Sequence, residues 1–288
     1  MTAGWIGALR DIVGAKHVLE DAASLLAYES DALTLFRCKP AAVILPNSTE
    51  EVMAIMRILH QAKIPCAARG AGTGLSGGAL VPEGGVILSM TRMNRILHIH
   101  SQQDHAVVEP GVVNLDLSRR AERFRKRYAP DPASQTVSTL GGNVAENAGG
   151  PMCFLHGTTT NHLLAAKVVL PDGSLHHWTV EDDLDLRGFL CGSEGTLGVI
   201  VELTLRLIHK PSRVVTMLAG YQDVPLACAA VAAIVAQGLR PVALEVMDQK
   251  AIQAVERSVY RAGLPQNAGA ILIAELEDVG GNLDVEQK

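Results

Sequence analysis

The sequence predicts an α+β fold, with a large first part and a smaller second part that begins after Pro211. Three observations lead to this prediction. Strand and helix patterns alternate over residues 41–69, three glycine-rich stretches lie among the strands that follow, and residues 214–276 again alternate strand with helix. Elements that alternate in this way pack as layers around a core. A chain of 288 residues is long enough for two domains, which we expect at 1–211 and 212–288.

The first elements follow from hydrophobic spacing and from a capping pattern. Residues 1–40 predict short amphipathic helices, and 41–46 predict a short buried strand. Ser48 and Glu51 then form a capping box, which satisfies free amides at a helix start. Apolar residues recur at helical spacing in the order Val52, Ile55, Met56 and Leu59. A strand restarts at 65–69, so we expect a β-α-β unit with a parallel strand pair.

Glycine dominates three later segments, at residues 70–85, 141–150 and 192–198. The first contains seven glycines: Gly70, Gly72, Gly74, Gly77, Gly78, Gly84 and Gly85. Around these segments we expect a helix over 115–127 and strands at 86–90, 96–100, 106–109, 164–170, 175–179 and 199–208. Beyond Pro211 we expect strands at 214–219, 242–247 and 270–276, with helices over 225–237 and 249–261.

The first glycine segment matches a dinucleotide fingerprint, but its surroundings argue against that fold. Gly72–Gly77 satisfies the pattern G-x-G-x-x-G, which in a Rossmann unit must open a helix. Here Pro82, Gly84 and Gly85 follow, and then a strand, so an NAD-binding Rossmann unit is disfavoured. The segment is a loop between strands, and its glycines let successive N–H groups converge on an anion. The alternative is a tight turn packed against a sheet.

Three such loops beside strand ends favour an elongated ligand. A ligand that touches backbone along its length needs several places where no Cβ blocks its approach. Asn143 and Asn147 add amides that can donate to and accept from a heterocycle. A dinucleotide fits this pattern better than a small anion does. Three unrelated tight turns are the alternative.

Several motifs in fixed order resemble the FAD-linked oxidases of the vanillyl-alcohol-oxidase type, which have a PCMH-type FAD-binding domain. The motifs are Pro46–Val52, Arg69–Ala79, Val108–Val112, Tyr128–Ser134, Gly141–Gly150 and Gly192–Ile200, with Tyr28–Asp31 and Leu244–Asp248 at either end. Within this family the chain is most similar to the branch that contains bacterial glycolate oxidase and D-lactate dehydrogenase. The resemblance implies an FAD-binding domain of two α/β subdomains, followed by a partial α/β, ferredoxin-like cap domain.

The resemblance also implies which residues hold the cofactor. The pyrophosphate of FAD is expected over Arg69, Gly70, Ala71, Gly72, Thr73, Gly74 and Ser76. The isoalloxazine and ribityl part is expected against Pro132, Ser134, Gly141, Gly142, Asn147, Gly149 and Gly150, and Ile200 is expected to contact the flavin or the adenine side. Some relatives bind FAD covalently through a histidine in the first glycine loop. Thr73 stands at that position here, so the resemblance implies non-covalent FAD.

The implied activity is oxidation of a small D-2-hydroxy acid, glycolate or D-lactate, to the 2-oxo acid. A hydride would pass to the flavin while a base takes the hydroxyl proton. In the family, the catalytic histidine and metal ligands come from a His-x-Gly-Asp-Gly-Asn-like motif, which does not occur in this sequence. We therefore expect a C-terminally truncated chain and can name no catalytic base. The alternative function is an FAD-binding module without catalytic activity.

Charge and cysteine content limit the partners and the compartment. The net charge of −5, from 25 Lys+Arg and 30 Asp+Glu, disfavours nucleic acid as a partner. Five scattered cysteines, no signal-peptide pattern and no apolar run of membrane-spanning length indicate the cytoplasm. The resemblance implies a quinone or another electron acceptor. It also implies partner subunits of a glycolate oxidase complex, which would place the chain peripherally at the inner face of the membrane.

Two further patterns have ordinary interpretations. His98 and His100 share a strand face near His105, but we interpret them as strand histidines and expect no metal site. The basic run over 119–127 is interpreted as a solvated helix face, with docking to an acidic partner subunit as the alternative.

Overall fold

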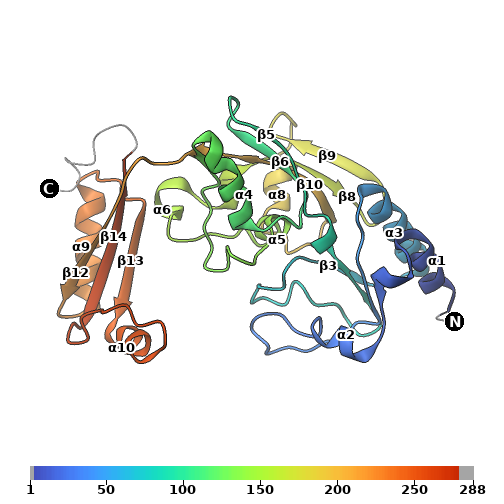
Figure 1. Ribbon diagram of the computed structural model, residues 1–288, viewed down its shortest axis with the longest axis horizontal. Coiled ribbons are helices and arrows are strands. Elements are labelled where there is room, and N and C mark those ends of the chain that lie inside the picture. Colours follow the sequence, from blue (N-terminus) through green and yellow to red (C-terminus); the bar gives the residue numbers. More distant parts are fainter. Residues whose placement is uncertain (1–2, 279–288) are drawn as a thin grey trace. The chain divides into compact units, whose positions relative to one another are not determined.

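The structure is a computed structural model that describes residues 3–278 of the chain. These residues divide into two compact units, which are described separately (Figure 1). The first unit contains residues up to Ala148 and then Thr158–His209, and the second contains Gly149–Gly157 and the residues from Lys210 onward. The α+β prediction is confirmed, because both units combine sheets with helices.

The first unit begins with a four-stranded sheet in the order β1-β2-β4-β3. Strands β2 and β3 run parallel to β4, and β1 runs antiparallel to β2. The predicted parallel pair is therefore present, but β4 lies between its two strands. The bounds are α1 (Ala3–Val13), η1 (Ala15–His17), β1 (Val18–Leu19), α2 (Ala22–Leu26), β2 (Ala42–Ile44), α3 (Thr49–Ala62), β3 (Cys66–Arg69), β4 (Val86–Ser89) and η2 (Met90–Arg92).

A second sheet of five antiparallel strands, in the order β5-β6-β10-β8-β9, completes the first unit. A short pair, β7 with β11, lies outside it. The strands are β5 (Ile96–His100), β6 (His105–Val108), β7 (Lys126–Arg127), β8 (Leu163–Val169), β9 (Leu175–Thr179), β10 (Val199–Arg206) and β11 (Ile208–His209). The helices are α4 (Asn114–Ala121), η3 (Glu122–Phe124), α5 (Leu140–Glu146), α7 (Thr159–His162) and α8 (Leu186–Leu190).

Two of the helical predictions need correction. The helix expected over 115–127 ends at Ala121, because Arg125 adopts a left-handed φ of 57° and Lys126–Arg127 pair with β11 as a strand. Helix α5 is not among the predicted elements, since it lies within the glycine-rich stretch at 141–150. Its start carries an ordinary signal, because the Thr139 hydroxyl accepts a hydrogen bond from the Gly142 N–H.

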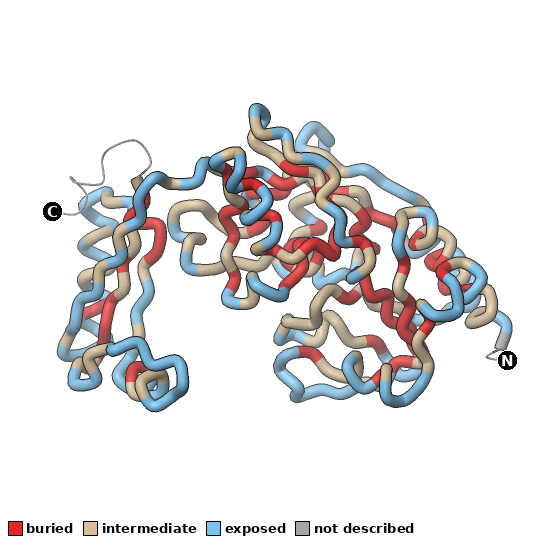
Figure 2. The backbone as a smooth tube through the Cα atoms, in the orientation of Figure 1, coloured by how far each residue is buried: buried red, intermediate tan, exposed pale blue. Residues whose placement is uncertain are grey.

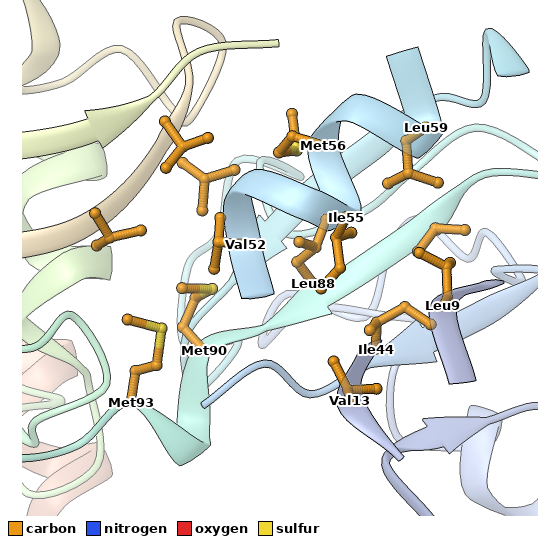
Figure 3. Close-up of a cluster of buried hydrophobic side chains, with 14 of the residues drawn as sticks. Leu9, Val13, Ile44, Val52, Ile55, Met56, Leu59, Leu88, Met90 and Met93 are labelled. Carbon is orange, nitrogen blue, oxygen red and sulfur yellow. The ribbon is translucent and has the colours of Figure 1, made fainter. Parts of the chain in front are cut away.

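Buried side chains of α1, α3 and the first sheet form one core (Figure 3). Leu9, Ile55 and Leu88 are fully buried there, and the same core includes Val169 and Val201 of the second sheet. Helix α3 therefore packs against both sheets. A second core lies between β6, β8 and β10 and the helices α4, α5 and α8. Figure 2 shows the buried backbone of the first unit running along these layers.

The second unit is built on a three-stranded antiparallel sheet in the order β12-β14-β13. Its elements are α6 (Cys153–His156), β12 (Val214–Tyr221), α9 (Val224–Ala236), β13 (Ala243–Asp248), α10 (Gln249–Arg257) and β14 (Ala270–Glu277). Aspartates cap both long helices, since Asp223 accepts from Leu226 N–H and Asp248 from Ala251 N–H. Helix α6 comes from the middle of the chain, and its His156 Nε2 lies 3.2 Å from Oε2 of the buried Glu277.

Leu88→Ala tests the core shared by the two sheets. Leu88 is fully buried, so its truncation leaves a cavity and should lower the free energy of unfolding by about 2–5 kcal/mol. Urea unfolding followed by circular dichroism measures the change. Leu184→Ala is the matched control, because Leu184 is 72% exposed and should change stability by less than about 0.5 kcal/mol. Equal effects of the two variants would contradict this assignment of the core.

Candidate functional site

The first unit contains a cavity of about 320 Å³ lined by all three glycine-rich stretches. This volume lies at the lower end of ligand pockets, which span roughly 300–1,000 Å³. Its wall is formed by Ala68, Arg69, Gly70, Ala71, Gly72, Thr73, Gly74, Leu75, Gly78, Ala79, Met90, Pro110, Ser134, Ser138, Thr139, Gly141, Gly142, Asn143, Ala145, Glu146, Ala148, Glu194, Gly195, Gly198 and Ile200. The structure thus brings together segments that are more than 100 residues apart in the sequence.

The loop that follows β3 presents unused backbone donors on the cavity wall. Within residues 3–278, none of the N–H groups of Ala71–Ser76 donates a hydrogen bond, and the first five of these residues line the cavity. The loop is held from the other side, because Ala32 N–H donates to Gly74 C=O and Gly77 N–H donates to Asp31 Oδ2 at 2.9 Å. Unpaired N–H groups beside a cavity need an acceptor, and together they favour an anion.

Arg69, at the end of β3, adds a positive charge to this wall. Its side chain is buried, and its guanidinium donates to the carbonyl groups of Ala79 and Ala27 at 3.4 and 3.3 Å. The guanidinium also lies 5.5 Å from the ring centroid of Tyr28. Burial lowers the pKa of Arg69 from its ordinary value. Gly72, at φ 72°, makes room for this arrangement, because a Cβ there would collide with Nη2 of Arg69.

Helix α5 forms the wall from the second glycine-rich stretch. Its first turn lies directly on the end of β6, since Leu140 N–H donates to Val112 C=O and Gly141 N–H to Pro110 C=O, both at 2.8 Å. A Cβ on Gly141 would be 2.6 Å from Cβ of Pro110. Gly141 therefore lets the first turn of α5 pack closely against Pro110.

A buried amide network fixes the start of α5. Asn114 Nδ2 donates to Asn143 Oδ1 at 2.9 Å and to the carbonyl of Pro130 at 3.1 Å. Asn143 Nδ2 in turn donates to the hydroxyl of Ser138 at 3.3 Å. Because Ser138 and Asn143 both line the cavity, this network positions polar groups of its wall.

Two carboxylates also face the cavity. Glu146 is the last residue of α5, and Glu194 belongs to the third glycine-rich loop, where its N–H donates to Ala145 C=O at 2.8 Å. Glu146 is exposed at the cavity wall, and desolvation there, followed by the negative charges of Glu194 and Asp31, raises its pKa. The cavity wall therefore combines backbone N–H donors and the Arg69 cation with the carboxylate of Glu146, which lies near Glu194.

Ten of the predicted cofactor residues lie on the cavity wall: Arg69, Gly70, Ala71, Gly72, Thr73, Gly74, Ser134, Gly141, Gly142 and Ile200. Within the first unit, Ser76, Pro132 and Asn147 do not line that wall. Ser76 follows the wall residue Leu75 and is exposed, and Pro132 is buried in the turn that precedes Ser134. Gly149 and Gly150 belong to the second unit.

Asn147 lies at the end of α5, one residue before the chain leaves the first unit. It ends α5 with a left-handed φ of 49°, and its Oδ1 accepts hydrogen bonds from the N–H and hydroxyl of Thr160 at 3.0 and 2.9 Å. Next to it, Ala148 C=O accepts from the N–H and hydroxyl of Thr159. The carboxamide that the sequence pattern assigns to a heterocycle thus bonds to protein in this structure.

Sequence reasoning missed several wall residues. Thr139 carried the signal of a helix N-cap, and Glu146 and Glu194 lie inside glycine-rich stretches, so their positions could have been inferred from those patterns. Met90 and Pro110 carry no such signal, because they reach the cavity only through the packing of η2 and the end of β6.

The other singled-out patterns are not part of the cavity. The rings of His98, His100 and His105 lie next to one another, but the described residues contain no group of three or more His, Cys, Asp or Glu side chains that could hold a metal ion. In the basic run, Arg119 lies 3.5 Å from Asp116 and is exposed. None of the described helices is both long and apolar enough to cross a bilayer.

Comparisons with known proteins agree with this architecture. Residues 40–179 match the model of an FAD binding domain, and residues 210–286 match the model of the C-terminal domain of FAD linked oxidases. The chain is 42% identical to glycolate oxidase subunit GlcD of Escherichia coli over 94% of this chain and 55% of that protein. It is 33% identical to D-lactate dehydrogenase of Anaerostipes hadrus, over 87% and 55%.

The chain therefore spans about half the length of the curated relatives it matches. Among solved structures, alkyldihydroxyacetonephosphate synthase superposes with a TM-score of 0.84 over 100% of this chain and 58% of that one, at 18% identity. This likeness supports the fold, an FAD-binding domain followed by part of a C-terminal domain, as predicted.

Asn114→Ala tests the amide network below the cavity. The substitution leaves Asn143 Oδ1 and the carbonyl of Pro130 without their donor in a buried site, which should lower the free energy of unfolding by about 1–3 kcal/mol. Thermal unfolding measures the shift in Tm. Asn94→Ala is the control, because Asn94 is exposed and makes no side-chain hydrogen bond within the part of the chain that the structure describes. A Tm unchanged in Asn114→Ala would refute the network's contribution.

Proposed function

Because the chain belongs to the FAD-linked oxidases of the vanillyl-alcohol-oxidase type, we propose that its cavity binds FAD non-covalently for the oxidation of a small D-2-hydroxy acid. The substrate is glycolate or D-lactate, and the product is the 2-oxo acid. The observation that carries the cofactor proposal is the run of unused N–H groups at Ala71–Ser76 beside the buried guanidinium of Arg69.

The cavity has the donors that a dinucleotide requires. Free N–H groups and the Arg69 cation favour the pyrophosphate at the first glycine loop. Gly141, Gly142, Ser134 and Ile200 line the cavity from other elements and are proposed for the ribityl chain and the ring system. Asn147 does not line the cavity. We propose that it positions the end of α5, because its Oδ1 accepts two hydrogen bonds from Thr160.

The composition of the cavity wall supports a non-covalent cofactor. Flavins attach to proteins through nucleophilic side chains, and none of the described wall residues carries an imidazole, a thiol or a phenol. Thr73, which stands where some relatives have the linking histidine, has only a weakly nucleophilic hydroxyl. The holding forces are therefore hydrogen bonds, the charge of Arg69 and apolar contacts such as Met90 and Ile200.

The chain's own residues bind and orient, and the chemistry of oxidation is that of the cofactor. When bound, FAD supplies a two-electron acceptor for the hydroxy acid. The α5 turn, fixed on Pro110 and by the amide network, holds its wall residues in one position. A preorganised wall of this kind orients bound reactants and lowers the entropic barrier to reaction.

The substrate class and partners are inferred from the relatives. Glycolate oxidase subunit GlcD and D-lactate dehydrogenase both carry 2-hydroxy acids in their names and align with most of this chain. Because GlcD is named as a subunit of glycolate oxidase, we infer that this chain also has partner subunits in a glycolate oxidase complex. We infer from the same resemblance a quinone or other electron acceptor, and a cytoplasmic position held at the inner face of the membrane by those subunits.

Gly72→Ala tests the cofactor site. A Cβ at position 72 adds strain at φ 72° and displaces the Arg69 guanidinium, so the affinity for FAD should fall by at least about tenfold, or 1.4 kcal/mol. Quenching of FAD fluorescence on titration measures Kd. Gly84→Ala is matched, since it has φ 81°, no atom within 4 Å of a built Cβ and no place on the wall. Equal affinities of both variants would argue against FAD at this loop.

The visible spectrum of the chain reconstituted with FAD tests the reaction. Anaerobic glycolate or D-lactate should bleach the flavin band, because the substrate's electrons then reside on the cofactor, and L-lactate is the stereochemical control. A bound band that persists with every acid would support the alternative, an FAD-binding module without turnover. Failure to observe a bound flavin band would reject the FAD proposal for this chain.

A further inference from the structure

Glu146 opposes the anion-binding character of the cavity. Its Oε1 lies 3.8 Å from the position that a Cβ would take on Gly74, and 3.0 Å from that position on Gly78. The carboxylate is therefore next to the loop whose N–H groups are unused. It makes no hydrogen bond or ion pair with the described residues.

The charged groups around Glu146 come from three other segments. Glu194 approaches from the third glycine-rich loop, where its Cβ is 3.4 Å from a Cβ position on Gly78. Asp31 approaches from the segment behind the first loop and is tied to it through the N–H of Gly77. Arg69 supplies a positive charge on the wall, but its guanidinium bonds to backbone carbonyls. Desolvation at the wall and the negative charges of both acids raise the pKa of Glu146, although its side chain is exposed.

We propose that binding of the anionic pyrophosphate of FAD at the first glycine loop is coupled to the uptake of one proton by the carboxylate of Glu146. This inference rests on the proposed cofactor site and adds a regulatory property to it. An anion that accepts the free N–H groups of Ala71–Ser76 increases the negative charge near a carboxylate that already lies close to Glu194 and Asp31. Protonation from solvent removes one of these charges.

The sign of the pH dependence follows from this coupling. The complex holds a proton on Glu146 that the free protein releases, so affinity is full at low pH and decreases as the pH rises between the two pKa values of this group. Over that interval the Kd for FAD should rise by up to about tenfold per pH unit, which is the limit for a single coupled proton.

Isothermal titration calorimetry of the whole chain with FAD, in two buffers of different ionisation enthalpy, counts the protons taken up. The titrations run upward to about pH 8 from the ordinary carboxyl pKa of about 4.3. The parent chain should take up a fraction of one proton and bind FAD more weakly as the pH rises. Glu146→Gln should abolish the uptake, flatten the pH dependence and bind FAD more tightly than the parent chain at the upper end of the range.

Glu181→Gln is the matched control, because Glu181 is exposed and does not line the cavity, and it should retain the parent behaviour. FAD binding by the parent without proton uptake at any pH would overturn the inference while leaving the cofactor site in place. So would proton uptake that persists in Glu146→Gln. Weaker binding by Glu146→Gln would also overturn it and would indicate that the carboxylate accepts a hydrogen bond from a hydroxyl of FAD. No binding of FAD by the parent would overturn the cofactor site and this inference together.

Discussion

The cavity depends on one close contact, in which the first turn of α5 lies on the backbone at the end of β6. Two hydrogen bonds from Leu140 and Gly141 to Val112 and Pro110 make this contact, and a side chain at Gly141 would prevent it. Through Thr139, the same turn lies against Gly70, where the first glycine loop leaves β3. The turn therefore links the end of β3 to the segment that follows β6. Displacement of α5 would alter the loops on both sides.

The wall built around that contact contains opposing charges. The free N–H groups and Arg69 attract an anion, whereas Glu146 and Glu194 repel one. The part of the attraction that comes from backbone N–H groups does not change with pH. The repulsion from Glu146 resides in a carboxylate that a proton can neutralise. The backbone N–H groups therefore select an anionic ligand at every pH, whereas the charge state of the carboxylate changes the affinity for that ligand.

Much of the fold could be predicted because many of its helices and strands follow from the spacing of hydrophobic residues that are close in the sequence. The helix spacing from Val52 to Leu59 and the alternating strand near residue 200 both depend on neighbours in the sequence, and both elements form. Glycine content was a less certain guide. It indicated the three cavity loops but concealed α5, whose core-facing Leu140 and Val144 outweigh the low helix propensity of two glycines. The basic residues after Ala121 resemble a continuing helix, but pairing of Lys126 with β11 ended it. Long-range pairing of this type leaves no local signal.

The candidate site shows the same division. The family resemblance implied the residues of the first loop as one stretch, and six of them, Arg69–Gly74, line the wall. Asn147 was predicted from its chemistry, but its partner, Thr160, could be identified only from the fold. Met90 lines the wall because of how η2 packs against other elements. This packing could not be predicted from the sequence.

The hydrogen bonds that Thr160 and Thr159 donate to Asn147 and Ala148 close a loop whose tip is formed by residues 149–157. A loop with fixed ends loses less entropy when it becomes ordered, so this short segment can join the second unit at a small entropic cost. Because residues 149–157 belong to the second unit, the coding sequence of that unit is divided between two parts of the gene. The buried Glu277 contacts His156, a residue encoded more than 100 positions upstream. A gene fragment that begins at Lys210 would lack that histidine, so the second unit cannot be transferred intact between proteins by one cut in the coding sequence.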